Sequence, residues 1–282
     1  MVGTRMGGLV VAEEIKKEVI LEVDALRARG TTPCLATVLV GDDPASAVYV
    51  RNKHKACAQC GIQTKDYQIP TDTAQGQLEG IIEDINNNDK IHGVLVQMPL
   101  PEHVDTNNII SKISPKKDVD GLTPYNAGLL VAGRARLVAC TPIGIIRMLN
   151  YYNIDIEGRH AVIINRSVLV GKPLYHLLLQ NNATVTTCHS RTKDIKKICS
   201  MADIIITGAG NPDRFVLTRD MIKDDAVVID VAINRINGKL TGDADYDDII
   251  QKASFVTPVP GGVGPMTVAM LLRNTLMAAK YA

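Results

Sequence analysis

The sequence is poor in aromatic residues. It has no Trp and only two Phe, and aromatic residues make up 4% of its 282 residues, whereas 46% of the residues are hydrophobic. A chain of this length can bury a large apolar core, as one large domain or as two ordinary ones. We therefore predict a core built from Ile, Val, Leu and Met.

An excess of charge, a long apolar run and an export signal are also missing. The 31 Lys and Arg residues nearly balance the 30 Asp and Glu residues, so the formal net charge is +1. This balance gives no reason to expect nucleic acid or an anionic membrane as a partner. No apolar run approaches the ~18 residues of a membrane span, and no signal-peptide core is found in the first eight residues. We expect a soluble, cytoplasmic protein.

The cysteines do not form the pattern of a disulfide framework or a zinc site. In a chain of this size without an export signal, we expect free thiols. Cys57-Ala-Gln-Cys60 has the spacing of a metal or redox pair, but no second Cys or His pair stands at a matching distance. A structural role is favoured over a metal or redox role, and no metal is predicted. The six cysteines are Cys34, Cys57, Cys60, Cys140, Cys188 and Cys199.

Strand and helix patterns alternate along the chain. This alternation predicts parallel strands joined by helical crossovers. The fold class is therefore α/β with two domains: an N-terminal α/β lobe and a C-terminal Rossmann-like domain with a doubly wound parallel sheet. Apolar runs that indicate strands fall at 34–40, 63–69, 92–97, 160–164, 183–188, 204–207, 227–231 and 255–259.

The boundary between the domains is expected where the second block of strands and helices begins. Residues 1–139 form the first predicted domain and residues 140–265 the second. The last helix, residues 266–282, is expected to return to the first domain. The turn Asn237-Gly238, between Arg235 and Leu240, predicts a small hairpin within the second domain.

One helix presents three polar side chains at spacings that suit a binding site. An apolar strand run precedes it, and Asp42 or Asp43 can accept hydrogen bonds from its first free amides. Ser46, Tyr49 and Lys53 lie on one face of this helix, because residues three and four apart are neighbours. The carboxyl ends of strands are where open α/β sheets bind ligands. Spacing alone fits an amphipathic surface helix with a solvated lysine equally well.

The second block has the outline of a dinucleotide-binding motif. Its first strand runs into Asn165-Arg166-Ser167, and a helix starts at Gly171. A loop that leads into a helix amino terminus can hold a pyrophosphate. Only one glycine of the Gly-x-Gly-x-x-Gly fingerprint is present, so the motif by itself is a weak signal.

The end of the next strand has no acidic residue. It offers Ser190 and Arg191, with Arg166 close by in the expected topology. In such folds an acidic residue at this strand end binds the ribose hydroxyl of NAD, whereas an Arg accommodates the 2′-phosphate of NADP. The sequence therefore favours NADP over NAD, with a solvated basic turn as the alternative.

Two further loops lie on the expected cofactor rim. Ala209-Gly210-Asn211-Pro212 follows the third strand of the block, and Asp230 to Asn234, with Ala232 and Ile233, follows the fourth. The last loop, Pro258 to Pro265, has three glycines and three prolines in eight residues. Such a backbone is locally stiff and yet can approach a ligand closely. Thr267 follows near the amino end of the closing helix.

Several strings of residues match one family over essentially the whole chain. Together they resemble the bifunctional methylenetetrahydrofolate dehydrogenase/methenyltetrahydrofolate cyclohydrolase family, and the first and last strings are long and specific. They are Val40-Gly-Asp-Asp-Pro-Ala-Ser46 with Tyr49 and Lys53, Gln97-Met-Pro-Leu-Pro101, Lys117-Asp-Val-Asp-Gly121, Cys140-Thr-Pro-Ile-Gly144, Arg166-Ser with Val170-Gly-Lys-Pro173, Ala183-Thr-Val-Thr with His189-Ser190, and Pro258 to Thr267.

The resemblance implies two reactions of one-carbon metabolism that serve purine biosynthesis. NADP oxidises 5,10-methylenetetrahydrofolate to the 5,10-methenyl cation, and hydrolysis then gives 10-formyltetrahydrofolate. The implied partners are tetrahydrofolate derivatives, and the implied assembly is a homodimer. NAD in place of NADP stays open. The alternatives are an enzyme with only one of the two activities and a non-catalytic nucleotide-binding protein on the same fold.

The resemblance also implies roles in the folate site. Lys53 is the proton-transfer residue of the hydrolytic step, and Gln97 orients it without adding a negative charge. Tyr49 lines the folate and helps to place the reacting carbon, while Asp120 accepts hydrogen bonds from the pterin. Ser46, Pro260, Gly261 and Gly262 complete the implied substrate site.

The implied cofactor site contains two departures from the family pattern. Asn165 and Ala232 stand where the family usually has Gly, and both add atoms beside the cofactor. Asn tolerates a left-handed backbone, so the loop at Asn165 is expected to keep its shape. The resemblance further implies cis peptide bonds at Leu100-Pro101 and Val259-Pro260. The implied cofactor-binding residues are Asn165, Arg166, Ser167, Ser190, Arg191, Ala232, Ile233 and Thr267.

Overall fold

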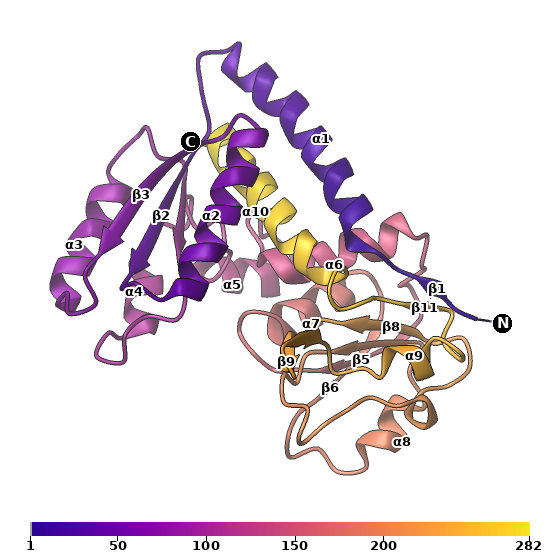
Figure 1. Ribbon diagram of the computed structural model, residues 1–282. Coiled ribbons are helices and arrows are strands. Elements are labelled where there is room, and N and C mark those ends of the chain that lie inside the picture. The colour runs from indigo at the N-terminus through magenta and orange to yellow at the C-terminus, as the bar shows by residue number, and fades with distance from the viewer. Residues whose placement is uncertain (1) are drawn as a thin grey trace. The chain divides into compact units, whose positions relative to one another are not determined.

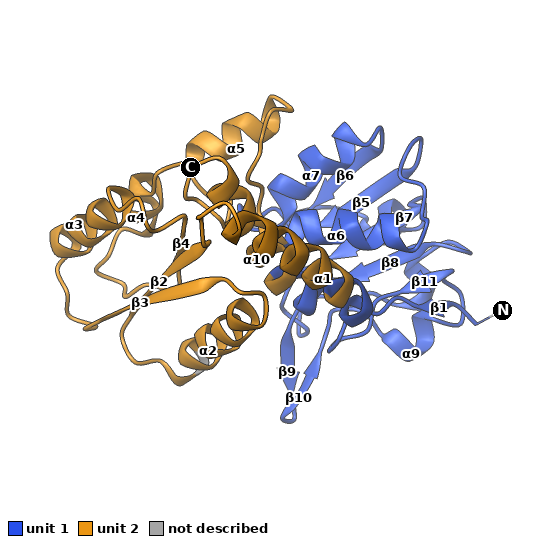
Figure 2. Cartoon of the chain, turned by 90° about the horizontal axis from the view of Figure 1, so that it is seen from above, with its two compact units in different colours: residues 1–12, 141–267 blue, residues 13–140, 268–282 orange. Residues whose placement is uncertain are grey.

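The chain divides into two compact units. The structure, a computed structural model, describes residues 2–282, and of Ala45 it describes the backbone only. Unit 1 contains the described part of residues 1–12 together with residues 141–267, and unit 2 contains residues 13–140 and 268–282 (Figure 2). The divisions fall within α1 (Gly8–Arg27) and α10 (Val263–Lys280), and near the start of α6 (Cys140–Tyr151).

Unit 2 is built on three parallel strands. β2 (Cys34–Val40) lies between β3 (Gln63–Ile69) and β4 (Gly93–Val96). All residues of β2 are buried, which explains its unbroken apolar run. The crossovers of this sheet contain α2 (Pro44–Gln59) and α3 (Gln75–Asn86), and Figure 1 shows the order of elements along the chain.

Two short helices follow the last strand of unit 2. α4 (Thr106–Lys112) begins where Asp105 accepts hydrogen bonds from two free backbone amides. α5 (Pro124–Val131) was not predicted, because its few residues contain Gly128 and no apolar period. Thr123 caps α5, since its hydroxyl accepts from the amide of Asn126 at 3.3 Å.

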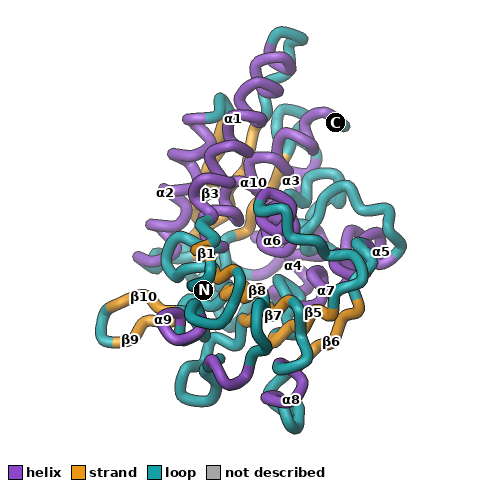
Figure 3. The backbone as a smooth tube through the Cα atoms, turned by 90° about the vertical axis from the view of Figure 1, so that its right-hand side faces the viewer, coloured by secondary structure: helices purple, strands orange, loops and turns teal. Residues whose placement is uncertain are grey.

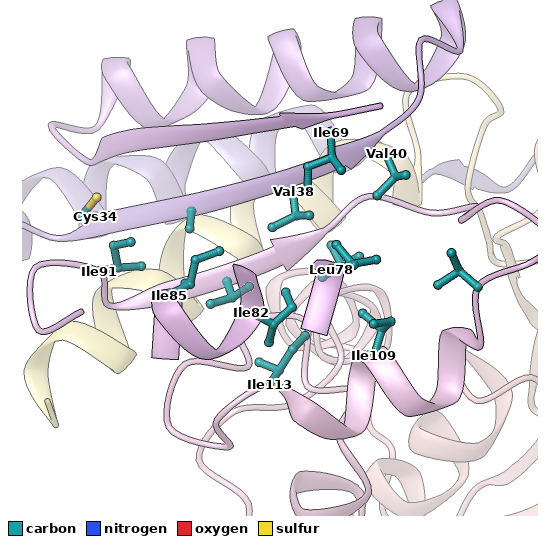
Figure 4. Packing of buried hydrophobic residues seen from close by; sticks show 14 residues of the cluster. Cys34, Val38, Val40, Ile69, Leu78, Ile82, Ile85, Ile91, Ile109 and Ile113 are labelled. Carbon is teal, nitrogen blue, oxygen red and sulfur yellow. The ribbon is translucent and has the colours of Figure 1, made fainter. Parts of the chain in front are cut away.

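One face of this sheet packs against α3 and α4. Leu78 and Ile82 of α3 are fully buried, and they share a cluster with Val38 of β2 and Ile109 of α4 (Figure 4). The buried residues of this cluster are spaced by two along β2 (Ala36, Val38, Val40) and by three or four along α3 (Leu78, Ile82, Ile85). The expected core of Ile, Val and Leu is therefore present in this unit.

Unit 1 contains a six-stranded sheet in which every pairing is parallel. Its order is β1-β11-β8-β7-β5-β6. The second strand of the block, β6, lies on one side of the first, β5, and the third, β7, lies on the other. This arrangement is a doubly wound sheet with its switch point between β5 and β7, and the predicted fold class is confirmed. The strands are β1 (Thr4–Arg5), β5 (His160–Ile164), β6 (Thr184–Cys188), β7 (Ile204–Thr207), β8 (Val227–Asp230) and β11 (Phe255–Val256).

The strand ranges agree with the sequence to within one residue at each end, apart from two differences. β11 ends three residues early, where Pro258 and Pro260 have no backbone N–H to donate to a neighbour. β1 was not predicted, because two residues are too few to show a period. Its pairing with β11 places residues 2–12 in unit 1, whereas we assigned residues 1–139 to the first domain.

The remaining elements of unit 1 are short. The predicted hairpin is formed by β9 (Asn234–Ile236) and β10 (Lys239–Thr241), which lie apart from the six-stranded sheet (Figure 3). Asn237 and Gly238 both have positive φ, as a tight two-residue hairpin turn requires. The helical segments are α7 (Gly171–Gln180), α8 (Ile195–Cys199), the 3-10 turn η1 (Arg219–Met221) and α9 (Tyr246–Ile249).

Two X-Pro bonds, the cysteines and the helix lengths bear on separate expectations from the sequence. Val259-Pro260 is cis as expected, but Leu100-Pro101 is not, whereas Met98-Pro99 is cis. In Met98-Pro-Leu-Pro101 both prolines weaken the trans preference equally, so the sequence does not distinguish them. All six cysteines are free and buried. Among residues 2–282 no helix has the length and apolarity needed to cross a membrane.

Two substitutions in α3 are expected to change stability in opposite directions. Ile82→Ala removes a fully buried side chain and should lower the free energy of unfolding by about 2–5 kcal/mol. Gly80→Ala, on the exposed face of the same helix, meets no neighbouring atom and should raise it by ~0.5–1 kcal/mol. Urea unfolding followed by circular dichroism measures both. Equal midpoints for the two variants would contradict this packing.

Candidate functional site

The helix that carries Lys53 is fixed at its start and along its length. Asp43, rather than Asp42, caps α2, because its carboxylate accepts from the backbone amide of Ser46 at 2.7 Å. In the middle of the helix, His54 Nε2 lies 3.1 Å from Thr37 Oγ1 on β2 and 3.0 Å from a carboxylate oxygen on β3. These contacts attach α2 to two strands of the unit 2 sheet.

Lys53 contacts the residue that directly follows β4. Its Nζ donates to Gln97 Oε1 at 3.0 Å. The Nε2 of Gln97 donates to the carbonyl of Met98 at 2.8 Å, which turns the amide oxygen toward the lysine. The structure therefore brings together two of the residues that the sequence singled out, and it defines the orientation of the amide.

Asp120 lies at the same end of the sheet. The segment before it pairs in parallel with β4, because Val94 bridges to Asp118 and donates to the carbonyl of Lys117 at 2.7 Å. Two residues further on, Asp120 is level with the end of β4. Burial raises the pKa of the Asp120 carboxyl, and the positive charge of Lys53 opposes this rise. An amine, an amide and a carboxyl thus gather at one end of the unit 2 sheet.

The loop that carries Asp120 is held from several sides. Asp118 is buried, and its carboxylate accepts from two backbone amides and from the Nδ2 of Asn126. From α10, the Nδ2 of buried Asn274 donates to the carbonyl of Val119 at 2.8 Å. The Sγ of Cys140 lies 3.7 Å from Asp120 Oδ1. No pattern in the sequence points to Asn274, because a lone Asn in an apolar helix has no recognisable spacing.

The other two predicted residues of α2 differ in exposure. Tyr49 is 53% exposed, so its ring is open to a ligand. Ser46 is only 5% exposed, and its backbone amide belongs to the helix cap. The predicted face is therefore more open at Tyr49 than at Ser46.

In unit 1, a cavity of about 490 Å³ lies at the switch point of the sheet. It is lined from the loops that follow β5, β6 and β7, where open α/β sheets bind ligands. Its lining has two Arg side chains and no Asp or Glu. The lining residues are Ile164, Asn165, Arg166, Cys188, His189, Ser190, Thr192, Ile195, Gly208, Ala209, Asn211, Arg214 and Phe215.

Asn165 organises the loop after β5 with its side chain rather than with its backbone. Its Oδ1 accepts from the amides of Ser167 at 2.8 Å and Gly171 at 3.0 Å, and its Nδ2 donates to the carbonyl of Gly208 at 2.6 Å. The backbone of Asn165 is not left-handed, since Asn165 is not among the residues with positive φ, so the tolerance of Asn for that conformation is not used here. The carboxamide instead links the two loops that flank the switch point.

The loop after β7 is held by a buried carboxylate. Asp243 accepts from Thr207 Oγ1 at 2.9 Å, from the amide of Ala209 at 2.6 Å and from that of Gly210 at 3.1 Å. Beside it, buried Asp230 accepts from the amide of Ala244 at 2.7 Å. Burial raises the pKa of Asp230 to about 6, and the neighbouring Asp243 adds to the rise.

Three of the predicted cofactor residues line the cavity and five do not. Ile233 is 59% exposed, whereas Ala232 is buried and donates its amide to Asp230. Thr267 Oγ1 lies 2.8 Å from Thr141 Oγ1. The lining residues are Asn165, Arg166 and Ser190, and the others are Ser167, Arg191, Ala232, Ile233 and Thr267. Asn211 belongs to the loop after β7 that the sequence placed on the cofactor rim, and it lines the cavity together with Arg214, to which no motif pointed.

The glycine- and proline-rich loop approaches backbone closely within unit 1. The carbonyl of Gly261, a residue with φ of 97°, accepts from the amide of Gly8 at 2.9 Å. A Cβ on Gly262 would lie 2.4 Å from the carbonyl oxygen of Pro258. Pro260 is exposed. These glycines thus have a packing role that the sequence left open.

Among residues 2–282 no group of three or more His, Cys, Asp or Glu side chains is arranged to hold a metal ion. Cys57 is buried, and burial raises the pKa of its thiol to about 12. A thiol in that environment is a poor metal ligand.

The fold and this geometry define a class of protein: a two-unit α/β protein with a cavity at the switch point of a doubly wound sheet, where proteins of this class bind ligands. Family models narrow the class. The tetrahydrofolate dehydrogenase/cyclohydrolase catalytic domain matches residues 6–120, and the NAD(P)-binding domain of the same family matches residues 139–282. The chain belongs to the tetrahydrofolate dehydrogenase/cyclohydrolase family.

Individual relatives agree over the full length. The bifunctional protein FolD of Nitrosopumilus maritimus is 61% identical over 282 residues, which cover 100% of this chain and 98% of that protein. The crystal structure of the Campylobacter jejuni bifunctional enzyme is 44% identical, with a TM-score of 0.96 and 99% of each chain covered. The Trypanosoma brucei dehydrogenase-cyclohydrolase, complexed with NADP cofactor and inhibitor, is 37% identical, with a TM-score of 0.92 and 99% and 98% covered.

The Asp230 carboxyl should make the protein less stable as the pH rises. Its pKa is raised in the folded state, so the folded chain binds more protons than the unfolded chain between ~pH 4 and pH 6. The free energy of unfolding should therefore fall across this window, by roughly 2–3 kcal/mol from this group. Urea unfolding at several pH values measures the fall.

Asp230→Asn is the control for this prediction. The variant has one carboxamide oxygen and cannot accept from the amides of both Ala232 and Ala244, so it should be less stable at every pH. Because Asn does not titrate, its free energy of unfolding should lack the part of the fall that Asp230 causes. Parallel curves for the two proteins would show that Asp230 is not the group responsible.

Proposed function

We propose that this chain oxidises 5,10-methylenetetrahydrofolate with NADP and hydrolyses the 5,10-methenyl product to 10-formyltetrahydrofolate. The observation that carries the proposal is the hydrogen bond from Lys53 to Gln97 at the strand ends that also hold Asp120. Family membership and full-length relatives named for both activities support it.

Lys53 is the proposed proton-transfer group of the hydrolysis. Water oxygen bonds to the methenyl carbon, one bond from that carbon to a ring nitrogen breaks, and one proton is released overall. An amine within reach can accept and return protons along this path. Gln97 fixes the amine through its oxygen and adds no negative charge, while its own orientation is held by the Met98 carbonyl.

The pterin and its reacting carbon are placed by neighbouring side chains in this proposal. Asp120 accepts from the pterin amino and ring N–H groups, which favours the ionised carboxylate that burial disfavours. Exposed Tyr49 lines the folate and helps to place the reacting carbon. Ser46, on the same face of α2, is proposed as a further substrate-binding residue. Pro260, Gly261 and Gly262 stay predicted substrate contacts from the family resemblance.

The residues present in unit 1 fit NADP. The cavity has two Arg side chains, no carboxylate, and Ser190 at the end of β6, where an NAD site has an acidic residue. Arg166 and Ser190 would hold the adenosine end, with Asn165 and Ser167 shaping the loop after β5. NADP supplies a hydride acceptor when bound. Arg191, Ala232, Ile233 and Thr267 stay predicted contacts from the family resemblance.

Loss of the dehydrogenase activity is the second candidate function, and one observation favours it. The carboxamide of Asn165 already accepts from the amides of Ser167 and Gly171 at the start of α7. Such amides are the groups that hold a pyrophosphate in related sites. If the Asn165 side chain keeps these amides from the pyrophosphate, the cofactor does not bind, and the chain keeps only the cyclohydrolase activity.

Purified protein should catalyse both reactions. We expect reduction of NADP with 5,10-methylenetetrahydrofolate, a lower kcat/KM with NAD, and hydrolysis of the methenyl compound, all followed by absorbance. Hydrolysis without reduction of either cofactor would favour the monofunctional alternative. Absence of both reactions in folded protein would refute the proposal. A homodimer and a role in purine biosynthesis belong to the same proposal and rest on the resemblance, whereas the proposed cytoplasmic location rests on the sequence, which has no apolar span and no signal-peptide core.

Lys53→Ala should abolish most of the hydrolysis. Removal of a general acid–base group lowers kcat by roughly 10²- to 10⁴-fold. Lys55→Ala, on the exposed part of the same helix, should leave hydrolysis within about twofold. Measured binding of a folate substrate checks that the Lys53 variant keeps its site. Normal hydrolysis in the Lys53 variant would remove its proposed role.

A further inference from the structure

The cavity of unit 1 contains a second cation that no sequence motif indicated. Arg166 follows β5 and Arg214 follows β7, so the two guanidinium groups belong to different loops of the same cavity. No Asp or Glu lines this cavity, and within residues 2–282 neither Arg forms an ion pair with a carboxylate. The positive charge of the cavity is therefore not balanced by the protein.

The loop that carries Arg214 is anchored. The Asp243 carboxylate accepts from the amides of Ala209 and Gly210 directly after β7. The amide of Arg214 then donates to the carbonyl of Asn211 at 3.1 Å, which closes a turn. The backbone of Arg214 is thus fixed relative to the strand end, while its exposed side chain keeps the freedom to adjust to a ligand.

The position of the cavity indicates which anion this charge suits. In a doubly wound sheet the ribose 2′ position lies at the end of the second strand, which is β6 here and ends next to Ser190. β5 neighbours both β6 and β7 (Figure 2), so the loops after all three strands surround this position. A guanidinium group matches the geometry of a phosphate.

We propose that Arg214, together with Arg166, binds the 2′-phosphate of NADP and so sets the preference of this chain for NADP over NAD. The inference rests on the proposed function. It differs from the expectation for Arg191, which lies next to Ser190 in sequence but does not line the cavity. The backbone amide of Arg191 instead donates to His189 Nδ1 at 3.2 Å.

The test is equilibrium binding to the purified full chain by titration calorimetry. The probes are NADP and NAD, and adenosine 2′,5′-bisphosphate and 5′-AMP, since each pair differs only in the 2′-phosphate. Arg214→Ala should weaken NADP and the bisphosphate about 10- to 100-fold, as loss of a charge-assisted partner does. Binding of NAD and 5′-AMP should change less than about threefold.

Three further variants make the result specific. Arg214→Lys, which keeps the charge but not the planar fork, should lose less than Arg214→Ala. Arg219→Ala removes an exposed Arg outside the cavity and should change no affinity. Arg191→Ala should weaken the bisphosphate less than Arg214→Ala does. Equal thermal midpoints show that all variants fold.

Several results would overturn the inference. They are unchanged binding in Arg214→Ala, equal losses for the probes with and without the 2′-phosphate, or a larger loss in Arg191→Ala. If the wild-type chain binds neither NADP nor the bisphosphate, the NADP-dependent activity fails together with this inference. If it binds NADP and Arg214→Ala binds it equally well, only the role of Arg214 fails.

Discussion

The proposed chemistry of unit 2 depends on one hydrogen bond, from Lys53 Nζ to Gln97 Oε1. A lysine side chain has many rotamers, and holding its amine in one place costs entropy. Gln97 reduces this freedom, because its amide is itself fixed by the Met98 carbonyl. The helix that carries Lys53, α2, is attached by His54 to two strands and capped by Asp43. The amine therefore has a defined position before any substrate binds.

In unit 1 the equivalent constraint is the link between the loops at the switch point. The Asn165 carboxamide joins the loop after β5 to the carbonyl of Gly208, and Asp243 holds the loop after β7. Both are short polar side chains that satisfy backbone groups near the end of a sheet. Neither side chain lines the cavity with a charge, and the guanidinium groups of Arg166 and Arg214 give it positive charge.

The spacing of apolar residues and the residues favoured in turns allowed most of the fold to be predicted. The buried strands and the Asn237-Gly238 hairpin carry strong local signals, whereas β1 and α5 are too short to show a period. The candidate site was predictable where residues lie in motifs, as Lys53 and Gln97 do. Arg214 and Asn274 contribute through tertiary position alone, and the side-chain hydrogen bonds of Asn165 carry no signal in the sequence.

The central claim is that hydrolysis depends on Lys53 as oriented by Gln97. A double-mutant cycle on the hydrolysis rate, with Lys53→Ala, Gln97→Ala and the double variant, tests it most directly. If Gln97 acts through Lys53, its removal should slow the wild-type enzyme but have little further effect once Lys53 is absent. Rate losses that simply multiply in the double variant would show that the two residues act independently, and would contradict the claim.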